Sequence, residues 1–250
     1  MKRIQFPFRF LFLLAVLLPY KTSYATCSPV EIEDSNKSNN YDTYMGVNFK
    51  QNWIKPRGGW NNLFVKEQPG FNVYFGWRFH PNFGAELGYE WTDNKPKAFA
   101  VQPGSTLLGV LNNSGAPVTL TGKVRFKTGA ADLNAFIPLC AEPLWEDVIP
   151  EGIISVGVAG MKASMKIFST TPATPFSNQF TTIQGRSKAV YRAGLGVQAL
   201  IIENFGIRVL WRVESTSFLR GRNSLTTTNN GTRVIFKNAN TLAVGLFFKF

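Results

Sequence analysis

The sequence predicts an all-β fold, an eight-stranded antiparallel up-and-down transmembrane β-barrel. Three observations favour it: a leader of the kind that directs export, eight segments in which apolar and polar residues alternate, and connections that alternate between short and long. A helical membrane protein is not expected, because nothing after residue 25 supplies the run of about 18 apolar residues that a transmembrane helix needs.

Residues 1–25 have the features of a cleaved secretory signal peptide. Lys2 and Arg3 give a positive start, residues 10–18 are continuously apolar, and small residues precede the expected cleavage point after Ala25. This pattern is typical of an export signal rather than a membrane anchor. We expect residues 26–43 to form a periplasmic N-terminal segment and residues 44–250 to form the barrel.

Strands are predicted wherever apolar and polar residues alternate with a period of two. Six segments do so clearly: 45–50, 71–79, 83–91, 189–198, 205–214 and 242–250. Two weaker strands are expected at 122–137 and 152–165. The alternation is unclear before Thr128, which leaves room for a β-bulge there.

The connections between these strands indicate how the barrel is oriented. Residues 80–82 and 202–204 form tight turns, and 138–151 is a proline-rich connection on the same side. The other connections are long and polar: 54–70, 92–118, 167–186 and 215–231. Short periplasmic turns and long extracellular loops are typical of outer-membrane barrels.

Charge placement agrees with a barrel whose apolar face meets lipid. Ten charged residues of the predicted strands fall on the opposite parity, which faces the lumen. The lumen of an eight-stranded barrel is just wide enough for its own side chains, so these charges must pair if they are dry. We expect a lumen salt-bridge network made of Lys50, Arg78, Glu86, Glu90, Asp132, Arg192, Arg208, Arg212, Glu214 and Lys249.

A soluble exported barrel with its apolar face inside would show the same alternation. The last strand favours the membrane protein, because its alternation closes on Phe248 and the terminal Phe250. This ending resembles the C-terminal strand by which outer-membrane proteins are recognised for assembly. We therefore expect Phe248 and Phe250 to form an assembly signal, the assembly machinery to be a partner, and the location to be the bacterial outer membrane.

With that leader, eight strands and the terminal Phe250, the chain resembles the OmpA-like outer-membrane β-barrel superfamily over roughly residues 41–250. The most family-like stretches are 82–89 (NFGAELGY) and 131–136 (ADLNAF). The resemblance implies the barrel fold and says little about function. Because the sequence ends at the barrel, no peptidoglycan-binding domain is implied.

The two cysteines, Cys27 and Cys140, suit an oxidising compartment. Cys27 is close enough to the cleavage point to raise the alternative of a lipoprotein anchor, but the residues before it match a lipoprotein box poorly. In the predicted topology both cysteines lie on the periplasmic side. We therefore expect a disulfide between Cys27 and Cys140.

The net charge of +12 points to a partner with an anionic surface. In an exported protein, that partner is membrane lipid rather than nucleic acid. Positive charge is concentrated in the predicted outward loops and strand tips, and lipopolysaccharide phosphates would neutralise it. The candidates for this contact are Lys162, Lys166, Arg186 and Lys188. The simpler alternative is a set of solvated loops on a basic protein.

No catalytic, cofactor or metal site is expected. A Ser–His–acid hydrolase needs a histidine base, and the single histidine, His80, falls in a predicted periplasmic turn. One histidine and two distant cysteines do not suggest a metal site, and no glycine-rich phosphate loop is present. Three classes of function stay open: first a structural or surface-interaction barrel, second a small porin or channel, third a lipid A-modifying enzyme.

Overall fold

The structure is a computed structural model that describes residues 42–57, 65–92, 95–107, 110–140, 148, 150–169, 175–177, 182–184, 188–215, 225–226 and 233–250. The predicted signal peptide and residues 26–41 lie outside these ranges. The first described strand begins at Asp42, slightly before the expected start of the barrel at residue 44.

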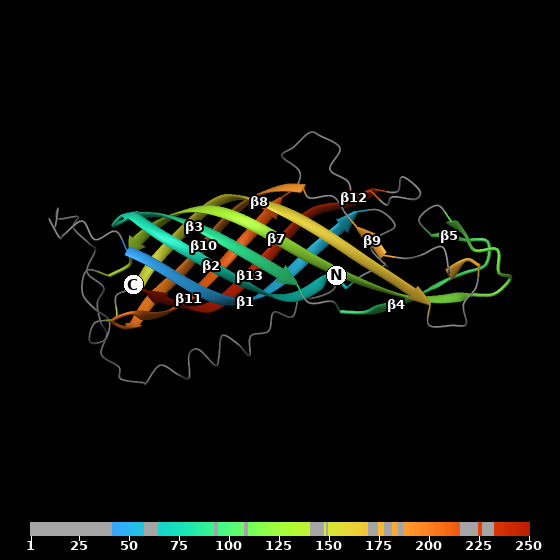
Figure 1. Ribbon diagram of the computed structural model, residues 1–250, viewed down its shortest axis with the longest axis horizontal. Helices are drawn as coiled ribbons and strands as arrows, with labels where there is room; N and C mark the ends of the chain where they lie inside the picture. The colour runs from blue at the N-terminus through green and yellow to red at the C-terminus, as the bar shows by residue number, and fades with distance from the viewer. Residues whose placement is uncertain are drawn as a thin grey trace, which may run out of the picture.

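Eight antiparallel strands form the closed barrel that the sequence predicts (Figure 1). Each pairs with its neighbours along the chain, and the first pairs with the last, Tyr44 opposite Lys249. Closure leaves the membrane-spanning sheet without a free edge. The barrel strands are β1 (Asp42–Arg57), β2 (Glu67–His80), β3 (Phe83–Thr92), β7 (Val118–Pro138), β8 (Pro150–Ser169), β10 (Lys188–Ile202), β11 (Phe205–Ser215) and β13 (Arg233–Lys249).

The outer face of the barrel is apolar. In β2, Phe71, Phe75 and Trp77 are 45%, 49% and 47% exposed, while the alternate residues Asn72 and Tyr74 are buried in the lumen. The same alternation runs around the barrel. An apolar exterior around a charged interior is the arrangement of an outer-membrane barrel, in which the exposed side chains meet lipid.

Glycines on the lumen parity make room for large side chains from neighbouring strands. A Cβ added to Gly76 would collide with the ring of Tyr44, and one added to Gly206 would collide with the ring of Phe247. One added to Gly194 would lie 2.8 Å from Arg212 Cγ. The absence of side chains at these positions allows aromatic rings and guanidinium groups to fill a narrow lumen.

Beyond the barrel, the extracellular end carries additional strands where the sequence indicated only loops. β4 (Lys97–Val101) pairs with β7, and β9 (Thr182–Gln184) pairs with β8, so β7 and β8 continue past the barrel as part of a sheet (Figure 1). The remaining short strands are β5 (Thr106–Leu107), β6 (Val110–Leu111) and β12 (Leu225–Thr226). These strands were missed because they are short, and β4 and β9 also depend on pairing with a strand from another part of the chain.

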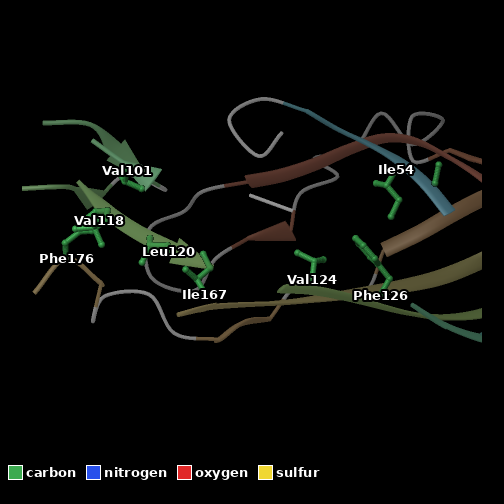
Figure 2. Packing of buried hydrophobic residues seen from close by; sticks show 9 residues of the cluster. Ile54, Val101, Val118, Leu120, Val124, Phe126, Ile167 and Phe176 are labelled. Atoms are coloured by element: carbon green, nitrogen blue, oxygen red, sulfur yellow. The ribbon is translucent and has the colours of Figure 1, made fainter. Parts of the chain in front are cut away.

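A cluster of buried apolar residues lies at this end (Figure 2). It contains Ile54, Val101, Val118, Leu120, Val124, Phe126, Ile167, Phe176 and Ala239. In the membrane part of β7 the inward side chains include the polar Thr128, Asp132 and Asn134, and the outward ones are apolar, as in Leu133. On the extracellular side of Thr128 the inward residues become apolar and the outward ones basic, as in Phe126 and Lys127.

This inversion explains why the alternation in β7 was hard to interpret before Thr128. The two faces exchange their chemistry, but the strand keeps its register with β8 from Leu120 to Pro138. The β-bulge considered at this point is therefore absent from the β7–β8 pairing. Register shifts occur instead at Lys55/Pro56, Arg78/His80 and Leu200/Ile202.

Candidate functional site

Glu90 on β3 is the centre of a buried ion-pair network in the lumen. Its Oε1 accepts hydrogen bonds from Arg192 Nη1 at 2.9 Å and from Asn72 Nδ2 at 3.2 Å, and its Oε2 accepts one from Lys50 Nζ. Arg212 Nη1 lies 3.4 Å from the same Oε1. Four strands besides β3 therefore converge on one carboxylate that is 2% exposed.

Asp132 on β7 joins the two arginines of this network from the other side. Its Oδ2 accepts hydrogen bonds from Arg192 Nη2 at 2.7 Å and from Arg212 Nη2 at 3.1 Å. Each arginine thus bridges Glu90 and Asp132. Such bridging stabilises the barrel geometry, because the forked guanidinium group holds two carboxylates in a fixed arrangement.

A second group of contacts continues from Glu86 toward the periplasmic end. Glu86 Oε1 accepts hydrogen bonds from Tyr44 OH at 2.7 Å and from Arg208 Nη1 at 2.6 Å. Arg208 also donates from Nη2 to Gln198 Oε1 at 2.6 Å. Gln198 Nε2 in turn donates to Glu151 Oε2 at 2.8 Å.

Aromatic rings pack around these charges near the periplasmic end. The edge of Tyr44 meets the rings of Tyr74, Phe136 and Phe247, with centroids 6.3, 6.4 and 6.3 Å apart. The Arg208 guanidinium lies 4.7 Å from the centroid of Tyr74, a cation–π arrangement. Charged groups and aromatic rings thus lie in contact in the lumen at this level.

The structure divides the ten predicted lumen charges into separate groups. Arg78 pairs with Glu151 at 2.7 Å and Lys249 pairs with Asp42 at 2.7 Å, both toward the periplasmic rim. The other eight are nearly inaccessible and balance in sign: Lys50, Arg192, Arg208 and Arg212 against Glu86, Glu90, Asp132 and Glu214. Glu214 is buried beside them, but its Oε1 has no hydrogen-bond partner among the described residues.

Several partners in this network were not identified from the sequence. Tyr44, Asp42 and Glu151 lie on the lumen parity of β1 and β8, so extending the alternation by a few residues would have found them. The amides Asn72 and Gln198 carry no charge and gave no comparable signal.

The four candidates for lipopolysaccharide contact are not all on one described face. Lys162 and Lys166 are exposed on the outward face of β8. Lys188 begins β10 opposite Met161, one position out of register with Lys162, and its side chain lies outside what the structure describes. Arg186 also lies outside the described residues.

The outward face of the neighbouring β7 adds three cations to Lys162 and Lys166. Lys127 pairs across strands with Lys162, Lys123 pairs with Lys166, and Arg125 lies between them opposite Ser164. We call Lys123, Arg125, Lys127, Lys162 and Lys166 the basic ladder. None of the ion pairs in the described part of the chain involves a member of it.

The cysteine and assembly-signal predictions fall at the periplasmic end. Cys140, in the β7–β8 connection, is buried and disulfide-bonded. Cys27, its predicted partner, lies outside the described residues, so the pairing stays a prediction. Phe248 and Phe250 are 43% and 61% exposed and lie on the outer face beside each other, with ring centroids 5.2 Å apart.

His80 is the exposed last residue of β2, directly before the β2–β3 turn. Its Nδ1 accepts a hydrogen bond from the backbone N–H of Asn82 at 3.2 Å, so the imidazole closes the turn. Among the described residues, no cluster of three or more His, Cys, Asp or Glu side chains is arranged to hold a metal ion. Within the same residues, no helix has the length and apolar character needed to cross a membrane.

No protein-family model matches the chain, and no curated protein matches it. Solved structures similar to it include the attachment invasion locus protein Ail of Yersinia pestis, with 16% identity and a TM-score of 0.43 over 84% of this chain and 99% of that one. Another is a major outer-membrane protein of Thermus thermophilus, with 13% identity and a TM-score of 0.45 over 83% of this chain and 99% of that one. A third is OprG of Pseudomonas aeruginosa, with 13% identity and a TM-score of 0.40 over 84% of this chain and 96% of that one.

Proposed function

We propose that this outer-membrane β-barrel has a structural or surface-interaction role, in which its basic extracellular side contacts lipopolysaccharide. The observation that carries the proposal is the segregation of charge along the barrel axis. The extracellular end presents an excess of cations over carboxylates among the described residues, and the phosphates of the outer leaflet lie at that end of an outer-membrane protein.

The segregation can be followed in the described side chains. At the extracellular end Glu67 is the single described carboxylate outside the lumen. Toward the periplasm, by contrast, Asp42 and Glu151 neutralise Lys249 and Arg78. The described extracellular cations are Lys66, Lys95, Lys97, Lys123, Arg125, Lys127, Lys162 and Lys166. Solubility alone does not require such an imbalance, whereas phosphate binding by lysine and arginine gives it a reason.

The lumen favours a structural role over the alternative of a small channel. Eight balanced charges and a layer of aromatic rings occupy the interior. An ion would have to displace contacts such as Arg208 to Glu86, at 2.6 Å, in order to pass. The network therefore supports a plug that holds the barrel together.

A lipid A-modifying enzyme is the weakest of the three classes. Its chemistry would take place at the outer leaflet, whereas His80 lies beside a turn at the opposite end of the barrel. We propose that the protein acts without catalysis and without a cofactor.

The proposal is tested by the unfolding temperature of the folded barrel in detergent micelles with and without added lipopolysaccharide. We expect lipopolysaccharide to raise this temperature at low salt and to raise it less at high salt, because exposed charges are screened. Equal unfolding temperatures with and without lipopolysaccharide at low salt would contradict the proposal.

A variant in which Lys162, Lys166, Arg186 and Lys188 are replaced by Gln tests the contact residues predicted from the sequence. It should gain less stability from lipopolysaccharide than the unmodified protein. If lipopolysaccharide stabilises the variant and the unmodified protein equally at low salt, these four residues are not the contact. The cations of the other loops must then be tested.

A further inference from the structure

The basic ladder places like charges directly opposite one another on neighbouring strands. Lys127 pairs with Lys162 and Lys123 pairs with Lys166. Like charges in direct cross-strand pairs are destabilising, and none of the described carboxylates forms an ion pair with the ladder. An arrangement of this kind is stabilised when a multivalent anion binds across both strands.

The ladder lies at the level where the barrel leaves the membrane. Lys127 pairs with Trp91 of β3, and Gly129 pairs with Tyr89. The rings of Tyr89 and Trp91 lie 6.0 Å apart on the outer face, in the manner of the aromatic girdle that marks a membrane interface. At the same level β7 exchanges its apolar outer face for a basic one. The ladder thus faces lipid headgroups.

Immediately on the membrane side of the ladder, the outer face of β7 and β8 carries almost no side chains. Gly129 of β7 pairs with Gly160 of β8, which pairs with Ala189 of β10. A Cβ added at either glycine would meet nothing within 4 Å. The next outward residue of β8 is Val158, which is 51% exposed and belongs to the apolar face. A shallow, featureless strip therefore separates the cations from the lipid-facing belt.

We infer that the basic ladder and the Gly129–Gly160 strip together form a binding site for one phosphorylated glycolipid of the outer leaflet, lipid A. The lysines and Arg125 bind its phosphates, its sugar backbone lies over the strip, and its acyl chains run down the apolar face. This inference rests on the proposed function and makes it specific, because it replaces a diffuse basic surface by a single site on β7 and β8.

The test compares four forms of the whole barrel in detergent micelles. The first is the unmodified protein, and the second is K127Q/K162Q, which removes two charges of the ladder. The third is the control K66Q/K95Q, which removes two extracellular charges outside the ladder. The fourth is G129L/G160L, which fills the strip with side chains. Lys66 and Lys95 are exposed and lie outside β7 and β8. The leucines have open space on the outer face, so the barrel should fold, which electrophoresis of unboiled samples checks.

Each form is titrated with bisphosphorylated lipid A, dephosphorylated lipid A and phosphatidylglycerol, and the unfolding temperature is recorded. We expect K127Q/K162Q to weaken the binding of bisphosphorylated lipid A by about tenfold and K66Q/K95Q to weaken it by less than about threefold. G129L/G160L should also weaken lipid A binding, while its response to phosphatidylglycerol stays that of the unmodified protein.

The alternative outcomes separate the two proposals. Equal losses in K127Q/K162Q and K66Q/K95Q, or a full response in G129L/G160L, would overturn the site while leaving a diffuse contact with lipopolysaccharide. Equal responses of the unmodified protein to lipid A and to phosphatidylglycerol would overturn the assignment to a glycolipid. No response of the unmodified protein to any lipid would overturn the proposed function as well.

Discussion

At the scale of single residues, the lumen depends on a few carboxylates that each neutralise several cations. Glu90 contacts Lys50, Arg192 and Arg212, and its side chain is 2% exposed. A buried charge that loses its partner is costly, because its desolvation is no longer offset. The contribution of Glu90 to stability is therefore best measured as the effect of removing the carboxylate partner of Lys50 and leaving Arg192 and Arg212 with Asp132.

We predict that Glu90→Gln lowers the free energy of unfolding by about 3–5 kcal/mol. The amide keeps the shape of the side chain and removes its charge, so cavity formation does not contribute. Urea-induced unfolding in lipid vesicles, followed by tryptophan fluorescence, measures the change. Glu203→Gln in the exposed β10–β11 turn is the control and should change the stability by less than about 0.5 kcal/mol.

The double variant Glu90→Gln/Lys50→Met should recover part of this loss, because it removes the cation that contacts Glu90 Oε2. If the single variant Glu90→Gln is as stable as the control Glu203→Gln, the network contributes little to stability.

Which lumen residues contact each other could not be predicted at this scale. The alternation of apolar and polar residues predicts which face of a strand each charged residue lies on, and it assigned all ten charges to the lumen face. Partner identity depends on the stagger between strands: Glu90 meets Arg192, which is 102 positions away in the sequence. Local sequence holds no information on that stagger, so the division into a central network and two rim pairs appears only in three dimensions.

At the scale of elements, the eight barrel strands followed from the sequence because each carries its own two-residue period. β4 did not, since four of its five residues are apolar and show no alternation with polar ones, and the strand is defined by its pairing with β7. β7 itself was ambiguous because its two faces exchange chemistry near Thr128. That exchange is informative, since it marks where the surroundings of the strand change from lipid to water.

The β7–β8 connection is the element in which we predict a covalent tie to the N-terminal segment. Cys140 is disulfide-bonded there, and Cys27 is its expected partner. In the chain-entropy model, closing a loop of about 100 residues contributes up to roughly 4–5 kcal/mol. Denatured, unreduced mature protein should show no free thiol, and Cys140→Ser should unfold at a lower urea concentration. Two free thiols, or a lipid attached to Cys27, would rule the pairing out.

At the scale of the whole molecule, the barrel combines three regions with different chemistry. An apolar belt faces lipid, a charged and aromatic plug fills the lumen, and an extracellular extension packs its own apolar cluster around Phe126 and Leu120 (Figure 2). The plug connects all the barrel strands that carry charges. The fold is therefore expected to be rigid in the membrane.

The plug predicts that the reconstituted protein does not conduct ions in discrete steps. Passage would require breaking buried ion pairs and displacing the rings of Tyr44, Phe136 and Phe247. Recordings in planar bilayers, made with a sample whose folding has been verified by electrophoresis, should show the baseline of bare lipid. A stable unit conductance would favour the channel alternative.

The central claim is that this chain folds as a closed barrel with lipid outside and charge inside, and electrophoretic mobility tests it most directly. A closed sheet whose backbone hydrogen bonds are all internal should resist detergent until boiled. The mature protein folded into vesicles is therefore expected to migrate at one position unboiled and at another boiled, and to sediment with the membranes. A single position under both conditions, with the protein left in the supernatant after the vesicles are sedimented, would contradict the account.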